Sequence, residues 1–345
     1  MCNYISKQDH EAGQQSEGTM TAHRPSQKAH PTGRDNATQP TAMMRTDLNS
    51  MMLPLFAEDT KVTNFSVNLN NQRVKIHARE DEDGDDRSVA GIADKKLLGL
   101  LNGYVAKKIR SGEHTTRHIY VEVSTLMRDM FGSSVHGGAD YARLAERLER
   151  LSFTVIEILT DLPGGGTRKR LFSWLDSVEY ERHADAAGGR LKSIEISFSK
   201  DAFEWITRAA GIDILPSTYQ SVGSSRASSW RVYEICLARL ISSGKDHTWI
   251  SLSELRDRIP ITSELKVFKS RTLRMAMASI QGSDEISGHI KLHLARLKNG
   301  EMQKIDFSQR CLLSDLYVVI SKGSRPLPES TPLLTGPTSA EVHKM

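Results

Sequence analysis

Several residue types and motifs are scarce in this sequence, and each scarcity removes a class of protein. Only three cysteines occur in 345 residues, and no two of them form a CxxC pair. This argues against a disulfide-rich secreted domain and against a zinc site, and it favours a reduced, cytoplasmic protein. No apolar run approaches the roughly 18 residues of a membrane span, and the N-terminus has no apolar signal segment. We therefore expect no association with a membrane.

Motifs for catalysis are missing as well. No GxxxxGK[ST] phosphate loop occurs, which argues against ATP hydrolysis. His289 and His293 lie four residues apart in a predicted strand, but no acidic partner is evident nearby, so a structural or surface role is favoured. We expect no catalytic residue, no cofactor and no metal.

The overall charge is only mildly basic, so its placement matters more than its size. The formal net charge is +4, yet residues 225–310 carry 15 Lys and Arg against 9 Asp and Glu. This surplus exceeds that of the whole chain. The basic character is concentrated in the C-terminal half, which favours a nucleic-acid partner for that half.

Composition divides the chain into four parts. Residues 1–50 are rich in Gln, Ser, Thr, His, Pro and Gly and have few aliphatic side chains, so we expect a disordered extension. Residues 51–212 and 213–322 show the periodic apolar pattern of two folded domains. Residues 323–345 are rich in Pro, Ser and Thr, which predicts a flexible tail.

The two central domains share an order of secondary-structure elements. In the first copy, a helix at Asp94–Gly112 precedes the short alternating strand HIYVEV, and a short helix follows the N-cap candidate Ser124. A longer helix spans Asp140–Leu151. Two strands then flank the glycine triplet Gly164–Gly166.

The second copy repeats this order. Its first helix, Ser228–Ser242, precedes the strand HTWIS, and a short helix begins at Ser253. A long basic helix spans Glu264–Ile280. Two strands then form a hairpin with Lys298–Glu301 at its tip, where Asn-Gly predicts a type I′ turn.

This order is that of a winged-helix domain, a helix-turn-helix followed by a β-hairpin wing. The sequence therefore predicts an α+β protein with two winged-helix domains in tandem. A further strand, Ser193–Ser199, and a helix that ends at Gly211 lie between the copies. That strand, or the helix Asp94–Gly112, is a candidate surface for a homodimer of the free protein.

The long helix of the first copy has two opposed faces at about 100° per residue. The apolar face carries Tyr141, Leu144, Leu148 and Leu151. The opposite face carries Arg143, Arg147 and Arg150, with a glutamate on either side. Two interpretations stay open: a solvated face held by Glu–Arg pairs, or a face that binds DNA.

The long helix of the second copy favours DNA more strongly. The face opposite its apolar side carries Lys266, Ser270, Arg271 and Arg274, and no carboxylate occurs between Leu265 and Gln281. A solvated face would normally mix charges of both signs. A helix in the major groove has to neutralise phosphates while Arg and Lys reach base edges.

The hairpin tips supply further cations. Three glycines allow a sharp turn and a close approach to another surface. Arg168, Lys169 and Arg170 follow at the edge of the first hairpin, and Lys298 lies at the tip of the second. Phosphate contacts or insertion in a minor groove would suit such wings. A flexible hairpin made soluble by its charges is the alternative.

The sequence resembles the replication initiator protein A family from plasmids of Gram-negative bacteria. The resemblance runs from about Leu53 to Phe307. It rests on the segments DYARLAERLERLSFTVIEI, FSWLDSVEYER, KSIEISFSKDAFEWI, SSWRVYEICLARL, WISLSELRDRI and ELKVFKSRTLR. The long N-terminal extension and the hairpin Gly164–Arg170 depart from the family's pattern.

The resemblance implies tandem winged-helix domains that bind repeated sequences (iterons) in double-stranded DNA at a plasmid origin. It also implies opening of adjacent AT-rich DNA and recruitment of the host replication initiator and the replicative helicase. We expect such an initiator, without catalytic activity. The alternatives are a tandem winged-helix transcriptional regulator that binds an operator and, more remotely, a nicking replication enzyme.

Overall fold

The computed structural model describes residues 43–330 and residue 333, with gaps at 59–60, 70, 80–86, 133–135, 183–190, 224–226 and 262. The fold is α+β, as predicted. Most of the predicted N-terminal extension lies outside the described residues. Its last part is ordered: strand β1 (Met44–Asp47) pairs antiparallel with β9 (Gly211–Ile214), and helix α1 (Leu48–Met52) follows. The predicted boundary at residue 50 is therefore wrong.

Strand β1 is held against helix α2 (Ile92–Arg110) at a position that requires glycine. A Cβ atom at Gly103 would lie 1.7 Å from the carbonyl oxygen of Met43, so any side chain there would push β1 away. Arg45 of β1 is 2% exposed and forms an ion pair with Asp213 of β9 at 3.3 Å. The predicted boundary was based on the spacing of apolar residues, and an ion pair or a close approach at glycine does not change that spacing. The boundary was therefore misplaced.

The helices of the first half follow the predicted order. Helix α2 precedes strand β4 (His118–Glu122), and α3 (Val123–Phe131) and α4 (Gly138–Phe153) come next. Thirteen consecutive or nearly consecutive positions of α2 are buried, from Ile92 to Ala106. Because α2 lies inside the protein, the prediction that it serves as a dimer surface is wrong for most of its length.

Strand β4 belongs to a three-stranded sheet of order β4-β8-β7, with β7 at Leu175–Arg182 and β8 at Leu191–Phe198. The sequence assigned β8 to the segment between the copies, but it is the central strand. Its Ile194, Ile196 and Phe198 are fully buried. It has partners on both edges, so the prediction of a free dimerisation strand there is also wrong.

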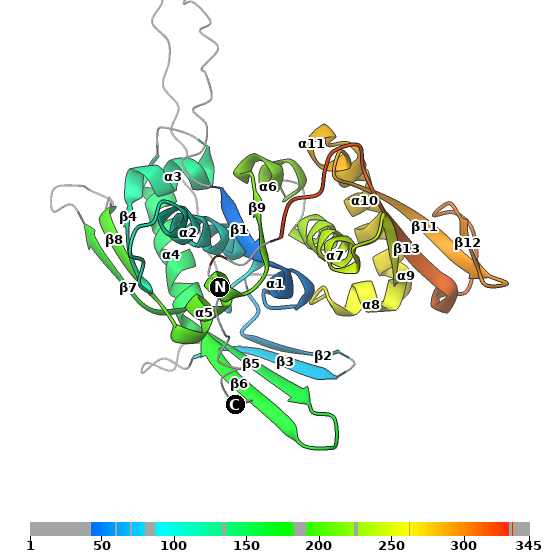
Figure 1. Cartoon of the computed structure of the whole chain (residues 1–345), viewed down its shortest axis with the longest axis horizontal. Helices are drawn as coiled ribbons and strands as arrows, with labels where there is room; N and C mark the ends of the chain where they lie inside the picture. Colours follow the sequence, from blue (N-terminus) through cyan, green and yellow to red (C-terminus); the bar gives the residue numbers. More distant parts are fainter. Residues whose placement is uncertain are drawn as a thin grey trace, which may run out of the picture. The chain divides into compact units, whose positions relative to one another are not determined.

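The glycine hairpin lies in a different sheet. Strands β5 (Thr154–Asp161) and β6 (Thr167–Ser173) pair with β3 (Gln72–Ala78) and β2 (Asn64–Leu69) in the order β2-β3-β5-β6. The hairpin follows α4 as predicted, yet it does not pair with β4. Its tip extends beyond the other two strands (Figure 1). The backbone φ angles of +94°, +88° and +99° at Gly164, Gly165 and Gly166 confirm the sharp turn.

Two helices and β9 connect the halves. Helix α5 (Lys200–Arg208) begins at the N-cap Ser199, whose hydroxyl accepts a hydrogen bond from the backbone N–H of Ala202. Helix α6 (Pro216–Gly223) follows β9. Trp205 of α5 packs in an aromatic cluster with Phe172 and Trp174, at ring-centroid distances of 5.4 and 6.1 Å.

The second half contains the predicted helices and hairpin. Helix α7 (Ala227–Ser243) and strand β10 (His247–Ser251) precede α8 (Leu252–Asp257), and the long basic helix runs from Leu265 to Gln281. Strands β11 (Ile290–Lys298) and β12 (Glu301–Lys304) form the hairpin. The left-handed backbone at Asn299 and Gly300, with φ of 53° and 84°, confirms the Asn-Gly turn.

The sequence missed strand β13 (Leu316–Lys322), which follows a short 3-10 turn at Leu313–Asp315. It lies between β10 and β11, so the order of the sheet is β10-β13-β11-β12. In each half, the strand that follows the first long helix pairs with the last strand of the sheet, as β4 does with β8 and β10 with β13. The other edge of that last strand pairs with the preceding long strand, β7 or β11. The repeat therefore extends from the helices to sheet topology, β4-β8-β7 matching β10-β13-β11.

The C-terminal segment is not loose where it is described. Gly323 and Arg325 donate backbone hydrogen bonds to the carbonyls of His289 (2.9 Å) and Gly288 (2.7 Å). The Nδ1 atom of His289 lies 2.8 Å from the carbonyl of Pro326. The predicted flexible tail therefore begins too early at residue 323.

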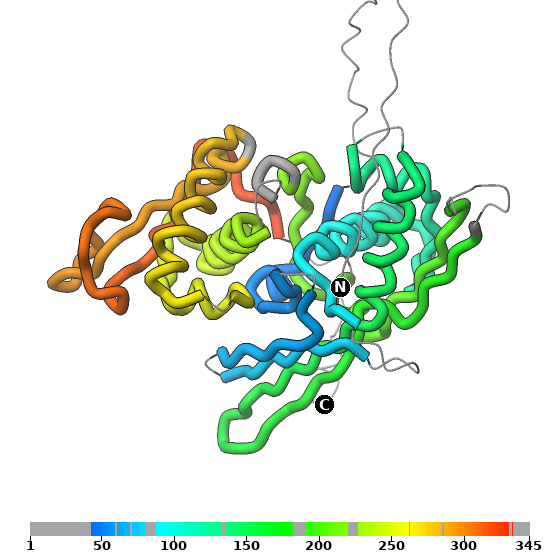
Figure 2. Tube along the Cα trace, turned by 180° about the vertical axis from the view of Figure 1, so that it is seen from behind, coloured from blue at the N-terminus to red at the C-terminus, as the bar shows by residue number. Residues whose placement is uncertain are grey.

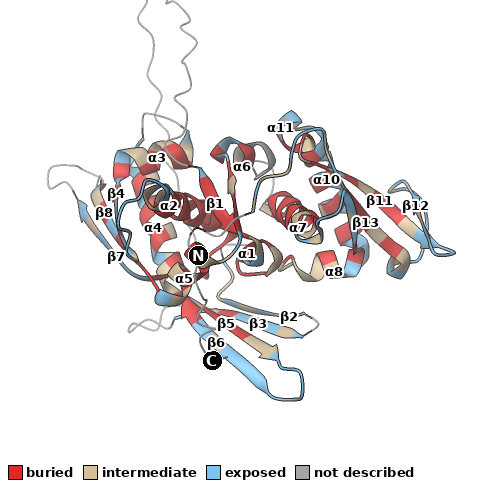
Figure 3. Ribbon diagram, in the orientation of Figure 1, coloured by how far each residue is buried: buried red, intermediate tan, exposed pale blue. Residues whose placement is uncertain are grey.

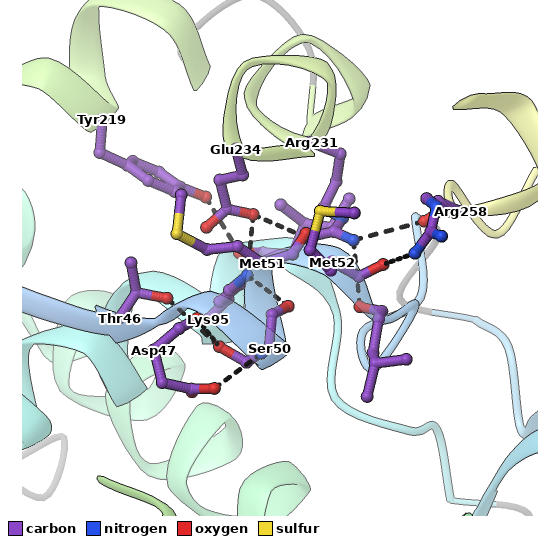
Figure 4. Close-up of polar contacts among 12 residues, drawn as sticks. Thr46, Asp47, Ser50, Met51, Met52, Lys95, Tyr219, Arg231, Glu234 and Arg258 are labelled. Carbon is purple, nitrogen blue, oxygen red and sulfur yellow. Dashed lines mark hydrogen bonds and ion pairs between the residues drawn. The ribbon is translucent and has the colours of Figure 1, made fainter. Parts of the chain in front are cut away.

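Two buried charged residues of α7, Arg231 and Glu234, form a polar network beside α1 (Figure 4). Arg231 donates to the carbonyl oxygens of Met51 and Leu53, both at 3.1 Å. Glu234 accepts from Arg231 and from Lys95 of α2, both at 2.8 Å. This network joins elements of both halves, and one hydrophobic cluster includes buried residues of both. Figure 3 shows buried residues in both halves.

Candidate nucleic-acid interface

The long basic helix of the second half presents the predicted polar face. Lys266, Ser270, Arg271 and Arg274 are all exposed. Within the described part of the chain, none of these three cations has an ion-pair partner. The opposite side of the helix is anchored by Phe268, Leu273, Ala276 and Ile280, which are fully buried. The placement of the four residues is thus as expected, and their contact with DNA stays a prediction.

This helix is not α-helical throughout. It consists of α9 (Leu265–Val267), a π-helical segment at Phe268–Leu273 and α10 (Arg274–Gln281), in one unbroken run (Figure 2). At about 100° per residue, Leu273 would point roughly 140° away from Phe268. The wider π turn brings both to the buried side.

Lys269 is the exception among the cations of this helix. Its side chain is 8% exposed, and its ammonium group donates to the carbonyl oxygen of Gln309 at 3.2 Å. It therefore holds the helix against the loop before β13 and cannot reach a ligand on the exposed face.

The β11–β12 hairpin carries further cations of the second half. Lys298 is exposed at the tip and has no ion-pair partner among the described residues. Lys304 of β12 is exposed as well, whereas Arg296 is only partly exposed and its Nε has no hydrogen-bond partner in the described part of the chain. Lys298 is placed where the sequence predicted it.

The three arginines of α4 do not share an exposed face, contrary to the prediction. Arg143 is 56% exposed and pairs with Asp140 at 2.7 Å. Arg150 is 18% exposed and donates from Nε and Nη2 to the buried carboxylate of Asp94, at 2.8 and 2.9 Å. Arg147 is 19% exposed and donates to the carbonyl of Ala93 at 3.3 Å.

These contacts fix α4 to the first turn of α2. The hydrogen bonds to Asp94 raise the pKa of Arg150, while burial lowers the pKa of Arg147. Asp94 also accepts from the backbone N–H of Gly91 at 2.8 Å, so it caps α2. Arg147 and Arg150 thus hold α4 against the start of α2. The sequence could not show this role, because Asp94 lies 56 positions from Arg150.

The cations of the glycine hairpin divide between two faces, since strand residues alternate. Arg168 is exposed and has no ion-pair partner within the described residues. Lys169 pairs with Glu157 at 2.9 Å on the opposite face. Arg170 donates to Asp201 at 2.9 Å and lies 5.3 Å from the rings of both Phe172 and Trp205. Of these three cations, Arg168 alone has no ion-pair partner in the regions that the structure describes.

Arg168 and Arg170 border an open cavity of about 580 Å³. Its wall includes Arg208 and Arg258, together with the apolar side chains Met52 and Trp205. Glu204 is the one carboxylate in that lining. The cationic character of the hairpin therefore continues into the groove beside it.

Three further points concern only the described residues. Among them, no group of three His, Cys, Asp or Glu side chains is placed to hold a metal ion. Helices of the described regions are also too short or too polar to span a bilayer. Trp249 of strand β10 is 46% exposed.

The sequence profile of the family "Replication initiator protein A" matches residues 45–280, more than half of the chain. The chain belongs to this family. A crystal structure of domains 2 and 3 of RctB is similar in fold, with a TM-score of 0.50 and 12% identity over 80% of this chain and 98% of that one. A second structure of RctB domains 2–3 gives a TM-score of 0.44, 12% identity, and 78% and 95% coverage. No curated protein sequence matches the chain.

Family membership places this protein in DNA replication as an initiator. The family match includes the arginine-bearing helix α4 and ends within α10, so it contains most of the exposed cationic face. The similarity to RctB supports the fold of both halves.

Proposed function

We propose that this initiator binds directly repeated sequences in duplex DNA at a plasmid origin, through two winged-helix units. The observation that carries the proposal is the face of the helix at Leu265–Gln281. Its cations are exposed and lack acidic partners among the described residues, in a protein of a replication initiator family. Cations without internal partners remain available for phosphates and base edges.

The winged-helix assignment rests on the order of helices and strands in both halves. In each, two helices follow the first strand of an antiparallel sheet, which has three strands in the first half and four in the second. The second of these helices is the longer. We propose that the helix at Leu265–Gln281 lies in a major groove, with Arg271 and Arg274 at the bases. The β11–β12 hairpin would then bring Lys298 to the backbone.

The glycine hairpin takes a different role from the one expected of a wing. It does not pair with β4, and it belongs to the separate sheet β2-β3-β5-β6. We propose that Arg168, at its exposed edge, contacts a phosphate. In the first half, Arg143 is the one arginine of α4 that is exposed enough for such a contact.

Opening of adjacent AT-rich DNA and recruitment of the host initiator and helicase belong to the same proposal. They are supported by family membership alone, and no enzymatic activity is required for them. A transcriptional regulator with the same fold would bind an operator without opening DNA.

The test uses a supercoiled plasmid that carries the protein's directly repeated sites beside an AT-rich segment. Permanganate should detect unpaired thymines in that segment only when the protein is added. Binding without unpaired thymines would favour a regulator. Nicked plasmid in the presence of a divalent metal would instead identify a nuclease.

A further inference from the structure

The outer face of the first three-stranded sheet is acidic. Inward-facing Ile119, Ile194 and Ile196 are buried, so strand alternation places their neighbours outside. One row across the sheet contains Tyr120, Glu195 and Glu179, and the next contains Glu122, Ser193 and Glu181. Tyr120 is 65% exposed, the second highest value among the large hydrophobic side chains of the described residues.

Two of these carboxylates oppose each other directly. Glu179 pairs in register with Glu195, both side chains are exposed, and neither has an ion-pair partner among the described residues. Like charges directly across a strand pair destabilise the sheet. A cationic surface that docks on this face would remove the repulsion.

The matching face of the second sheet is basic and aromatic. Its rows contain His247, Ser321 and Lys291, then Trp249, Val319 and His293, then Ser251, Tyr317, Ala295 and Lys304. None of these residues is acidic. Lys291 and Lys304 are exposed and have no ion-pair partner within the described regions. Burial and the nearby Lys304 lower the pKa of His293, so two basic groups are crowded here.

The two faces correspond in topology as well as in charge. Tyr120 is the third residue of the edge strand β4, and Trp249 is the third residue of the edge strand β10. Each face therefore combines one exposed aromatic side chain with charges mainly of one sign. Lys192, which pairs with Glu181 at 3.3 Å, is a cation at the edge of the acidic face. Two acidic faces, or two basic faces, would repel each other, which argues against a symmetric dimer through either one.

We propose that copies of this chain associate head to tail, with the acidic β4-β8-β7 face of one copy against the basic β10-β13-β11 face of the next. Each face measures roughly 15 Å by 15 Å, from a strand spacing of about 4.8 Å and a rise of about 3.3 Å per residue. This is far less than the about 800 Å² per partner of a stable interface. The free protein should thus associate only weakly.

Such a contact is heterologous, so it joins any number of copies in one direction, as an array of direct repeats requires. Copies held on neighbouring sites have a high effective concentration, and a weak contact then becomes significant. The array part of this inference rests on the proposed function. The contact between the two faces does not.

Sedimentation velocity without DNA tests the contact separately from DNA binding. At low salt, the wild-type protein should show a sedimentation coefficient that rises with concentration, and the rise should disappear in high salt because exposed charges are screened. The variant E179K/E195K replaces the two facing carboxylates of the acidic face with cations, and K291E/K304E replaces both lysines of the basic face with carboxylates. Each alone should associate at least about tenfold more weakly.

The decisive sample is the equimolar mixture of these two variants. Every face then finds a complementary one on the other variant, and association should return to near the wild-type level. The control E113K/E329K carries the same charge change as E179K/E195K at exposed positions outside both sheets and should behave as wild type. Lack of association in the wild type, wild-type association by either variant alone, or a mixture that stays monomeric would each overturn the proposal.

Discussion

Arg150 and Asp94 form a bidentate ion pair between helices α4 and α2, with donor–acceptor distances of 2.8 and 2.9 Å. The carboxylate is fully buried, and the arginine is 18% exposed. Asp94 also caps the start of α2 through the N–H of Gly91. One carboxylate thus organises the junction of two helices that the sequence presents as independent.

Replacing Arg150 with Ala should destabilise the fold by about 1–3 kcal/mol, because it leaves the buried Asp94 carboxylate with fewer donors. Arg143→Ala is the matched control on the same helix. Its exposed pair with Asp140 should contribute less than about 1 kcal/mol. Urea unfolding of both variants measures the difference. Equal effects would contradict the structural role assigned to Arg150.

Arg271→Ala and Arg274→Ala should weaken binding to the cognate duplex by about 1–3 kcal/mol each if the side chain reads a base. Specificity at the contacted base pair should relax at the same time. Lys200→Ala, an exposed cation of α5, serves as the control. Unchanged affinity of the double variant, measured by fluorescence anisotropy, would show that this helix does not read the site.

The glycine hairpin should contribute to binding through its phosphate contacts, mainly through Arg168. Arg168→Ala should weaken binding to cognate and random duplexes alike and reduce the slope of log affinity against log salt by roughly one. Arg170→Ala breaks the pair with Asp201 and the packing on Trp205, so a loss of stability should accompany any effect on DNA. A loss of affinity at the cognate site only, with the slope intact, would contradict phosphate contact by Arg168.

Lys95 should make stability depend on alkaline pH. Burial lowers its pKa from 10.5 to about 8, so between these values the unfolded chain binds more protons than the folded one. Stability should therefore rise with pH across this window, by roughly 1–3 kcal/mol. Below about pH 8 the contribution should be constant. Lys96, whose pKa burial also lowers to about 8, should act in the same direction.

The variant Lys95→Met isolates this effect, since Glu234 keeps its pair with Arg231 at 2.8 Å. Urea unfolding across pH 7 to 10 should show a smaller rise for Lys95→Met than for the wild type. Parallel curves for the two proteins would mean that Lys95 keeps an ordinary pKa in the folded state.

The sequence was sufficient for the longer helices, because their apolar residues recur at helical spacing. It also placed the exposed face with Arg271 and Arg274, where no carboxylate interrupts the charge. It failed where a distant partner decides the outcome. The sequence indicates that Arg150 is a surface cation. In the fold it pairs with Asp94, which lies 56 positions away in the chain.

The sequence could not show which strands pair with one another, for the same physical reason. A β-strand shows which of its faces is apolar, but nothing local says which strand lies next to it. Thus β4 pairs with β8, although the glycine hairpin follows sooner in the chain. Leu273 shows a further limit, because a local π turn changes the angular period on which the prediction of a buried face depends.

The measurement that tests the central claim most directly is a footprint combined with the mass of the complex. One duplex should carry a single asymmetric repeat, and the protein should be present in slight excess. We predict one copy of the chain per site, with two protected stretches about 10–10.5 base pairs apart, one for each half. A dimer that protects a palindrome would contradict the account and identify an operator-binding regulator.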